Sequence, residues 1–110
     1  MVITQNHGDH IGGTPFFSPP AALVIHARVA EDLKKLKPYQ VSSWRKRFPE
    51  RAAALTNISP LDAALTFDRN MTIELGGTRI ELIYPEDQYN PGDVLVWLPQ
   101  TRVLHASFGG

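Results

Sequence analysis

A stretch of alternating apolar and polar residues in the second half of the chain places the strongest constraint on the fold. Residues 71–75 and 78–84 alternate in this way on either side of two glycines, Gly76 and Gly77. A period of two indicates strands, and paired glycines supply the positive φ angles that a two-residue hairpin turn requires. We therefore predict a β-hairpin. Its inner face is expected to carry Ile73, Leu75, Ile80 and Leu82.

The first half of the chain has a different pattern, in which short apolar runs stand beside a helical period. Residues 1–4 are typical of the end of a strand, and the apolar run over 22–26 is typical of a buried parallel strand. Residues 28–36 carry apolar side chains at helical spacing, and Pro38 is expected to end that helix. A second helical stretch is predicted over residues 40–54.

Two more strands are predicted near the end of the chain, over residues 93–98 and 102–106. Strands that flank a helix in the first half, followed by consecutive strands in the second, indicate an α/β fold with a mixed sheet and helices on one face. A chain of 110 residues has room for one core, so residues 1–110 are expected to form a single domain.

The composition excludes several classes of protein. The chain has no cysteine, which excludes disulfides, thiolate metal sites and a thiol nucleophile, and its apolar runs are too short to span a bilayer. We expect a soluble, cytoplasmic protein. The net charge is zero, but residues 1–57 hold eight basic against four acidic residues, whereas residues 58–110 hold three basic against seven acidic. Complementary halves can pack on each other or on a second copy.

A polar, glycine-rich segment near the start of the chain carries candidate metal ligands. Residues 4–13 read Thr-Gln-Asn-His-Gly-Asp-His-Ile-Gly-Gly, which brings His7, Asp9 and His10 together directly after a predicted strand. Histidine and aspartate suit zinc or another borderline divalent ion. The segment resembles the signature of the metallo-β-lactamase superfamily, His-x-His-x-Asp-His followed by glycines. The predicted strands, hairpin and turns follow in that family's order, so the resemblance covers nearly the whole chain.

The departures from that signature decide what the resemblance implies. The family's first histidine falls on Gln5, a third histidine falls on Tyr89, and a bridging aspartate falls on Phe108. A neutral amide or a phenol is a much weaker zinc donor than imidazole. Hydrolytic zinc needs about three protein ligands and an open water position. The resemblance therefore implies the family's fold without its usual dinuclear hydrolytic site.

Two interpretations of the loop stay open. In the favoured one, His7 and Asp9 form hydrogen bonds within an inherited loop, no cofactor is held, and the protein acts through binding or oligomerisation. In the alternative, His7, Asp9 and His10 hold a single zinc ion, and the protein is a metal-dependent hydrolase of ester, thioester or lactam bonds. Asp9 would then be the catalytic base, and Gln5 and Tyr89 would line the site.

Two further histidines could have either a structural role or a role as ligands of that site. His26 stands at the end of a predicted strand, and His105 occupies an apolar position in another strand. A structural role is favoured for His26, and a core or interface position is favoured for His105. Either of them, or a residue of a partner subunit, is also a candidate for completing a single zinc site.

The chain is shorter than members of that superfamily, which implies that a sheet edge and apolar faces are left uncovered. We therefore expect a homo-oligomer, most simply a two-fold dimer in which the partner replaces the absent half. A third candidate function is nucleic-acid binding by the basic, aromatic stretch over residues 34–51. Its neighbouring acids argue against that function, because such stretches are more often solvated helices. No membrane contact is predicted, and no small-molecule ligand can be named.

Overall fold

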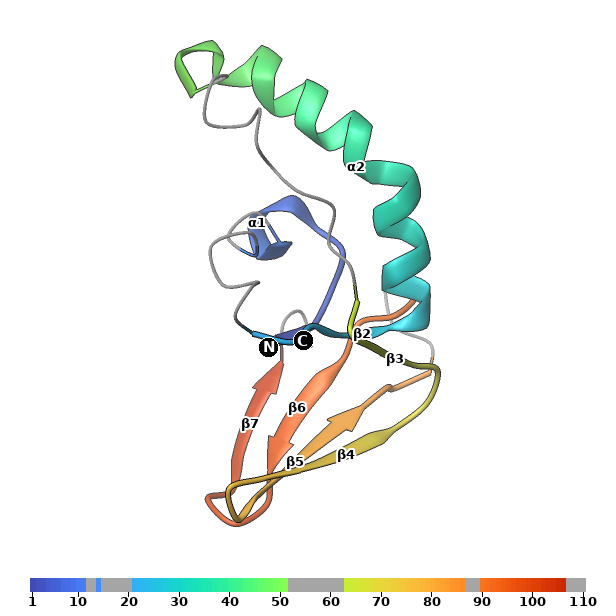
Figure 1. The fold of residues 1–110 in the computed structure, drawn as a ribbon, viewed down its shortest axis with the longest axis vertical. Helices are drawn as coiled ribbons and strands as arrows, with labels where there is room; N and C mark the ends of the chain where they lie inside the picture. Colours follow the sequence, from blue (N-terminus) through green and yellow to red (C-terminus); the bar gives the residue numbers. More distant parts are fainter. Residues whose placement is uncertain (12–13, 15–20, 52–62, 87–89, 107–110) are drawn as a thin grey trace.

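Two β-sheets and one long helix make up the fold (Figure 1). The computed structural model describes residues 1–11, 14, 21–51, 63–86 and 90–106, and it gives the backbone alone for residues 8–9 and 35–41. The molecule measures 44 × 32 × 21 Å. Its long axis runs from the turns of the second sheet to the far end of the long helix (Figure 1).

The first sheet has three parallel strands in the order β1-β2-β3. They are β1 (Val2–Ile3), β2 (Val24–His26) and β3 (Leu65–Phe67). Parallel neighbours need a crossover connection, and the helix α2 (Ala27–Arg47) lies in the connection between β2 and β3. The predicted strands over residues 1–4 and 22–26 are confirmed, each shorter than its apolar run.

The hydrophobic core lies between this sheet, the first turns of α2 and the short helix α1 (Gly8–Ile11). Val29 and Leu33 stand one helical turn apart, so both side chains face the sheet. Burying an aliphatic side chain of this size contributes about 1.5–3 kcal/mol. The buried members of the core are Ile3, Ile11, Leu23, Ile25, Val29 and Leu33.

The prediction that Pro38 ends the first helix is wrong, because α2 continues through it to Arg47. A proline inside a helix removes one backbone hydrogen bond and crowds the carbonyl one turn earlier, and a bend relieves that crowding. Figure 1 shows α2 curving along its length. The separately predicted helix over residues 40–54 is therefore, as far as Arg47, the second half of α2, and the 3₁₀ turn η2 (Pro49–Arg51) follows. Residues 52–54 of that prediction lie outside the described residues.

The second sheet is an antiparallel meander in the order β4-β5-β6-β7. Its first two strands form the predicted hairpin, and its last two confirm the strands expected near the end of the chain. The strands are β4 (Met71–Leu75), β5 (Thr78–Ile83), β6 (Leu95–Leu98) and β7 (Val103–Ala106).

The hairpin turn is the glycine pair, as predicted. Gly76 and Gly77 have φ angles of 56° and 79°, and Leu75 pairs with Thr78 across the turn. The expectation that Leu75 lies on a buried inner face is wrong, since its side chain is 68% exposed. Leu75 sits at the tip of the hairpin, beyond the part of the sheet that the rest of the chain covers.

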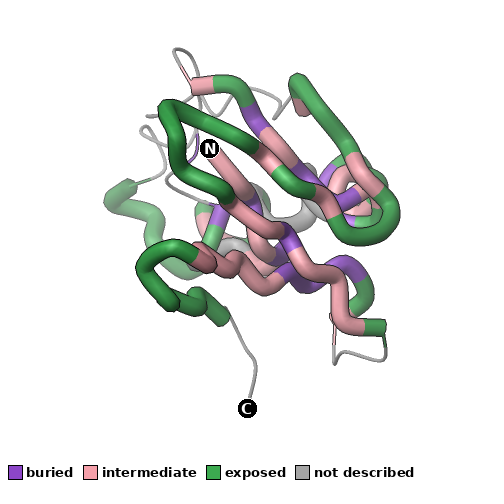
Figure 2. The backbone as a smooth tube through the Cα atoms, turned by 90° about the horizontal axis from the view of Figure 1, so that it is seen from below, coloured by how far each residue is buried: buried purple, intermediate pink, exposed green. Residues whose placement is uncertain are grey.

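Every residue of β7 is exposed, and among the described residues no strand pairs with its outer edge (Figure 2). Val103 and Leu104 are 51% and 54% exposed. His105 is also exposed, so the expectation of a core position for it is wrong. β7 is therefore an open, uncharged edge strand, a type of surface that natural proteins seldom leave unprotected.

The α/β class, with parallel and antiparallel strands together, is confirmed. The two sheets meet where β3 leads into β4 and where β6 begins beside the end of β1, through a hydrogen bond from the Val94 N–H to the Thr4 carbonyl (2.9 Å). Among the described residues, no helix combines the length and the hydropathy needed to cross a bilayer.

Candidate functional site

The candidate site lies at the carboxyl end of β1, in the loop that carries the predicted ligands. The carbonyl of His7 accepts hydrogen bonds from the N–H groups of His10 (3.0 Å) and Ile11 (3.1 Å), which closes the single turn of α1. Ile11 is buried in the core and holds this turn against the sheet. The segment from His7 to Ile11 is therefore a short helical turn that Ile11 anchors in the core.

The loop is also tied to α2. The side-chain amide of Asn6 donates to Oδ2 of Asp32 over 3.1 Å, and Asn6 itself is 9% exposed. A partly buried hydrogen bond between an amide and a carboxylate is stronger than a neutral one and fixes the direction in which the loop leaves β1. His7 is half-buried and His10 is exposed.

Gln5, at the start of the loop, is completely buried. Its side chain is 0% exposed, and neither Nε2 nor Oε1 has a hydrogen-bond partner among the described residues. Buried amides are nearly always hydrogen-bonded, because leaving one unpaired costs about 1–3 kcal/mol. The buried Gln5 amide is therefore an unusual feature of this part of the loop.

The turn before β6 brings a second set of buried polar atoms to the same place. Asp93 is 5% exposed, and among the described residues its carboxylate oxygens and Nδ2 of Asn90 have no hydrogen-bond partner within ordinary bonding distance. The N–H of Asp93 donates to the Asn90 carbonyl (3.1 Å), which closes the turn. Its neighbour Val94 donates to Thr4, the residue before Gln5. We call Gln5, Asn90 and Asp93 the amide–carboxylate cluster.

The electrostatics of the cluster depend on burial. Burial raises the pKa of the Asp93 carboxyl above its usual value, because the carboxylate is poorly solvated there. The neighbouring Asn90 amide opposes this rise, and so do His7 and His10 through their charge. The carboxyl thus lies in the electrostatic field of both loop histidines.

The predicted ligands are only partly brought together. His7 directly precedes α1 and His10 lies within it. Asp9 also lies in α1, with its side chain outside the described part, and Tyr89 and Phe108 lie outside the described residues. Within the described side chains, no three His, Asp or Glu residues converge in an arrangement that can hold a metal ion. Zinc prefers three or four nitrogen, sulfur or carboxylate ligands. The described side chains therefore do not fit the zinc that the resemblance in sequence implies.

Sequence reasoning missed Asn90 and Asp93. The residues 90–93 read Asn-Pro-Gly-Asp, which is typical of a turn. One sequence feature could have indicated Asp93: it is an acidic residue directly before a strongly apolar strand, where a side chain is expected to be buried. Their position beside Gln5 comes from a contact between residues about ninety positions apart in the chain, and no local pattern shows it.

A concave surface lies at the start of α2. An open pocket of about 440 Å³ is lined by His26, Ala27, Arg28, Glu31, Asp68, Tyr84 and Glu86. His26 is 2% exposed, and its Nδ1 accepts the N–H of Arg28 over 3.3 Å, so it caps the helix. Its ring lies 4.2 Å from that of Tyr84 and meets Phe67 edge-on. Burial lowers its pKa, partly offset by Asp68.

The fold is similar to that of a metallo-β-lactamase from Pontibacter korlensis, with a TM-score of 0.65, 21% sequence identity and coverage of 94% of this chain. The chain has a metallo-β-lactamase-like fold. It spans 38% of the length of that metallo-β-lactamase. No protein-family model matches the sequence, so the likeness establishes the metallo-β-lactamase-like fold alone.

Proposed function

We propose that this metallo-β-lactamase-like chain is a non-hydrolytic binding protein that acts as a dimer of two copies. The observation that carries the proposal is Gln5, which is 0% exposed at the position where the superfamily's signature has its first histidine. A carboxamide is neutral and a weak zinc donor, and a fully buried one has no room to move aside for another ligand. The resemblance puts Tyr89 and Phe108 at two more ligand positions, and neither provides an imidazole or a carboxylate.

The dimer is supported by the open edge of β7. Val103 and Leu104 are more than half exposed, and the strand has no charged residue. Natural edge strands are usually protected by lysine, proline, a bulge or a covering element. A second copy can pair its own β7 antiparallel to this one about a two-fold axis, which buries the apolar side chains of both strands.

The charge distribution also favours a second copy as the partner. The far end of α2 is basic and exposed, with Arg45, Lys46 and Arg47 in its last turn. The second half of the chain is acidic, and its exposed carboxylates include Asp68, Glu74 and Glu86. Two copies of one chain can therefore attract each other through unlike surfaces while the net charge stays at zero.

The dimer is tested with two matched substitutions of exposed leucines. Leu104→Glu places a charge on the β7 edge, and Leu75→Glu places the same charge at the tip of the hairpin, on the opposite edge strand. We expect light scattering after size exclusion to give a dimer for the parent and for Leu75→Glu and a monomer for Leu104→Glu. A monomeric parent, or equal effects of both changes, contradicts the dimer.

One observation favours the alternative of a zinc-dependent hydrolase. The charges of His7 and His10 oppose the rise in the pKa of the buried Asp93, so both imidazoles lie within electrostatic reach of that carboxyl. The test is hydrolysis of ester, thioester and lactam substrates with added zinc, by the parent and by the double variant His7→Ala, His10→Ala. Our proposal expects no difference between them. Zinc-dependent turnover that the double variant loses, with its fold retained by circular dichroism, supports the hydrolase.

A further inference from the structure

The far end of α2, together with η2, concentrates positive charge on one exposed part of the protein. Residues 42–51, which we call the basic end, hold four basic residues and one acidic residue, for a net charge of +3. Every residue from 45 to 51 is exposed. The acidic residue, Glu50, lies 3.9 Å from Nε of Arg51. The basic residues are Arg45, Lys46, Arg47 and Arg51.

The basic end projects away from the rest of the protein. In Figure 1 the last turns of α2 lie at the top of the view, away from both sheets. The buried core residues that α2 provides, Val29 and Leu33, lie in its first two turns. Packing of an apolar face is the main source of helix stability in proteins, and the basic end adds no residue to the described core. Its charged surface is therefore available for binding.

The structure removes the argument that neighbouring acids weaken this surface. Glu31 and Asp32 lie near the start of α2, where Asp32 accepts a hydrogen bond from Asn6 and Glu31 lines the pocket beside His26. At a rise of about 1.5 Å per residue, Asp32 is roughly 20 Å along the helix from Arg45. This distance exceeds the Debye length of about 8 Å at physiological ionic strength, so these acids do not neutralise the basic end.

Aromatic side chains stand among the cations. Phe48 is 41% exposed, and the guanidinium carbon of Arg47 lies 5.5 Å from the centre of its ring. Trp44, one helical turn earlier, is half-buried, and its carbonyl accepts the N–H of Phe48 over 2.8 Å. An exposed ring beside an arginine is a surface on which an unpaired nucleobase can stack, while the surrounding cations contact phosphates.

The arrangement also distinguishes between anionic partners. Arg45, Lys46 and Arg47 are consecutive, so they leave the helix at intervals of about 100° and interrupt any apolar face. A helix that binds a membrane surface needs such a face. An acidic protein surface pairs with the cations but offers no partner for the ring of Phe48, and a duplex keeps its bases stacked on one another. A single strand offers both phosphates and unstacked bases.

We propose that the basic end of α2 is a binding surface for single-stranded nucleic acid, in which the four cations contact phosphates and Phe48 stacks on a base. The proposal goes beyond the proposed function and does not depend on dimerisation, because all of these residues belong to one chain. A second copy that occupied the basic end instead would be detected as a change in the mass of the assembly.

The test is fluorescence anisotropy of the full chain with a labelled single strand of about 15 deoxyadenosines. Four phosphate contacts predict that the logarithm of the association constant falls with the logarithm of the salt concentration, with a slope of about −3. The triple variant Arg45→Gln, Lys46→Gln, Arg47→Gln should bind roughly tenfold more weakly, or worse, at about 50 mM salt. Its slope should fall to about −1.

Matched variants separate the local surface from the overall charge. The control removes three exposed arginines elsewhere in the chain, and it should keep the affinity within roughly twofold and the slope unchanged. This control is Arg69→Gln, Arg79→Gln, Arg102→Gln. Phe48→Leu should weaken binding roughly fivefold with the slope unchanged, whereas Phe48→Tyr should bind like the parent, because it retains the ring. Circular dichroism should show the parent fold for every variant, since all of these side chains are exposed.

Several outcomes would overturn the proposal. One is a parent that does not bind the strand at about 50 mM salt. Others are equal losses in the two triple variants, a duplex of the same length that binds as tightly as the single strand, or a Phe48→Leu variant that binds like the parent. Light scattering that gives a dimer for the parent and a monomer for Arg45→Gln, Lys46→Gln, Arg47→Gln would assign the basic end to a second copy instead.

Discussion

The N–H of Val94 donates a hydrogen bond of 2.9 Å to the carbonyl of Thr4, and this contact joins the two sheets at the candidate site. It places the turn before β6 beside the loop after β1, although the two segments lie at opposite ends of the sequence. The consequence is that two buried polar side chains, Gln5 and Asp93, stand next to the residues that form this contact. The arrangement gives each residue near this contact a distinct, measurable role.

Gly92 is the residue that lets the turn approach α2. Its φ angle of 100° is unfavourable for any side chain, and a Cβ would stand 2.8 Å from Val29 and 3.1 Å from Cβ of Arg28. Gly92→Ala should therefore lower the free energy of unfolding by about 2 kcal/mol or more. Gly77→Ala is the control, because φ is also positive there (79°) but nothing lies within 4 Å. Urea unfolding should show the larger loss for Gly92→Ala, and equal losses would contradict the packing argument.

His26 is expected to be structural, as the N-cap of α2. His26→Ala removes the acceptor of the Arg28 N–H and a buried ring that packs on Tyr84, so we expect a loss of about 2–4 kcal/mol in the free energy of unfolding. His26→Asn keeps a capping acceptor and should lose about 1 kcal/mol less. If the asparagine variant is as unstable as the alanine variant, the cap contributes nothing.

The same histidine should make folding stability depend on pH. Burial lowers the pKa of His26 in the folded state below its ordinary value of 6.5, so the unfolded chain binds this proton more readily. The stability contributed by the neutral imidazole is complete above 6.5 and is lost as the pH falls towards the lower, folded-state pKa. The stability difference between the parent and His26→Asn should therefore shrink between about pH 8 and about pH 5. A constant difference would show that the imidazole does not titrate with folding.

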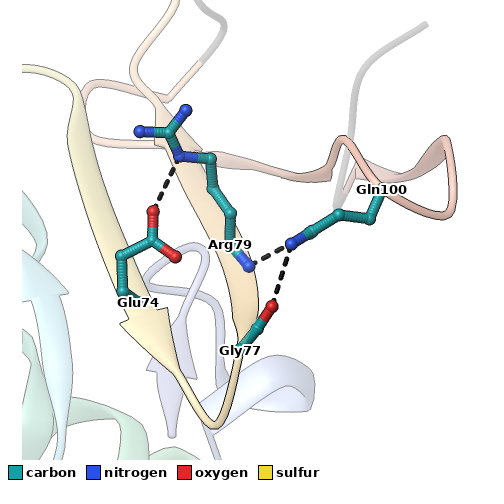
Figure 3. A network of polar contacts seen from close by, with 4 residues as sticks. All are labelled: Glu74, Gly77, Arg79 and Gln100. Atoms are coloured by element: carbon teal, nitrogen blue, oxygen red, sulfur yellow. Dashed lines mark hydrogen bonds and ion pairs between the residues drawn. The ribbon is translucent and has the colours of Figure 1, made fainter.

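Gln100 links the two hairpin turns of the second sheet (Figure 3). Its Oε1 accepts the N–H of Arg79 and its Nε2 donates to the Gly77 carbonyl, both at 3.0 Å. Gln100→Ala should cost about 1–2 kcal/mol in unfolding free energy. Glu74→Ala removes only the exposed ion pair with Arg79 (2.9 Å) and should cost less than about 1 kcal/mol. The reverse order would mean that the ion pair, and not Gln100, stabilises this end of the sheet.

The local features of the fold could be predicted because each follows from its own residues. The hairpin needs only the alternation over 71–84 and the positive φ angles that Gly76 and Gly77 supply. The helix after β2 was predicted from its spacing, but its end was placed wrongly at Pro38, since a bend is an alternative to termination and the sequence does not distinguish the two.

The site could be predicted only in part. His7 and His10 were recognised because they share one short loop, whereas Asn90 and Asp93 reach Gln5 through a contact between opposite ends of the chain. Leu75 and His105 are exposed because no other element covers their part of the second sheet. The residues next to them in the sequence do not show whether such a covering element exists. The roles proposed for Asp9 and Tyr89 stay predictions.

The central claim, a metallo-β-lactamase-like fold used for binding as a dimer, is tested most directly by native mass spectrometry of the chain with and without added zinc. The account predicts a dimer whose mass does not change by a stoichiometric zinc ion. A monomer, or an oligomer that takes up one or two zinc ions per chain and hydrolyses an ester, thioester or lactam in proportion to them, would contradict it.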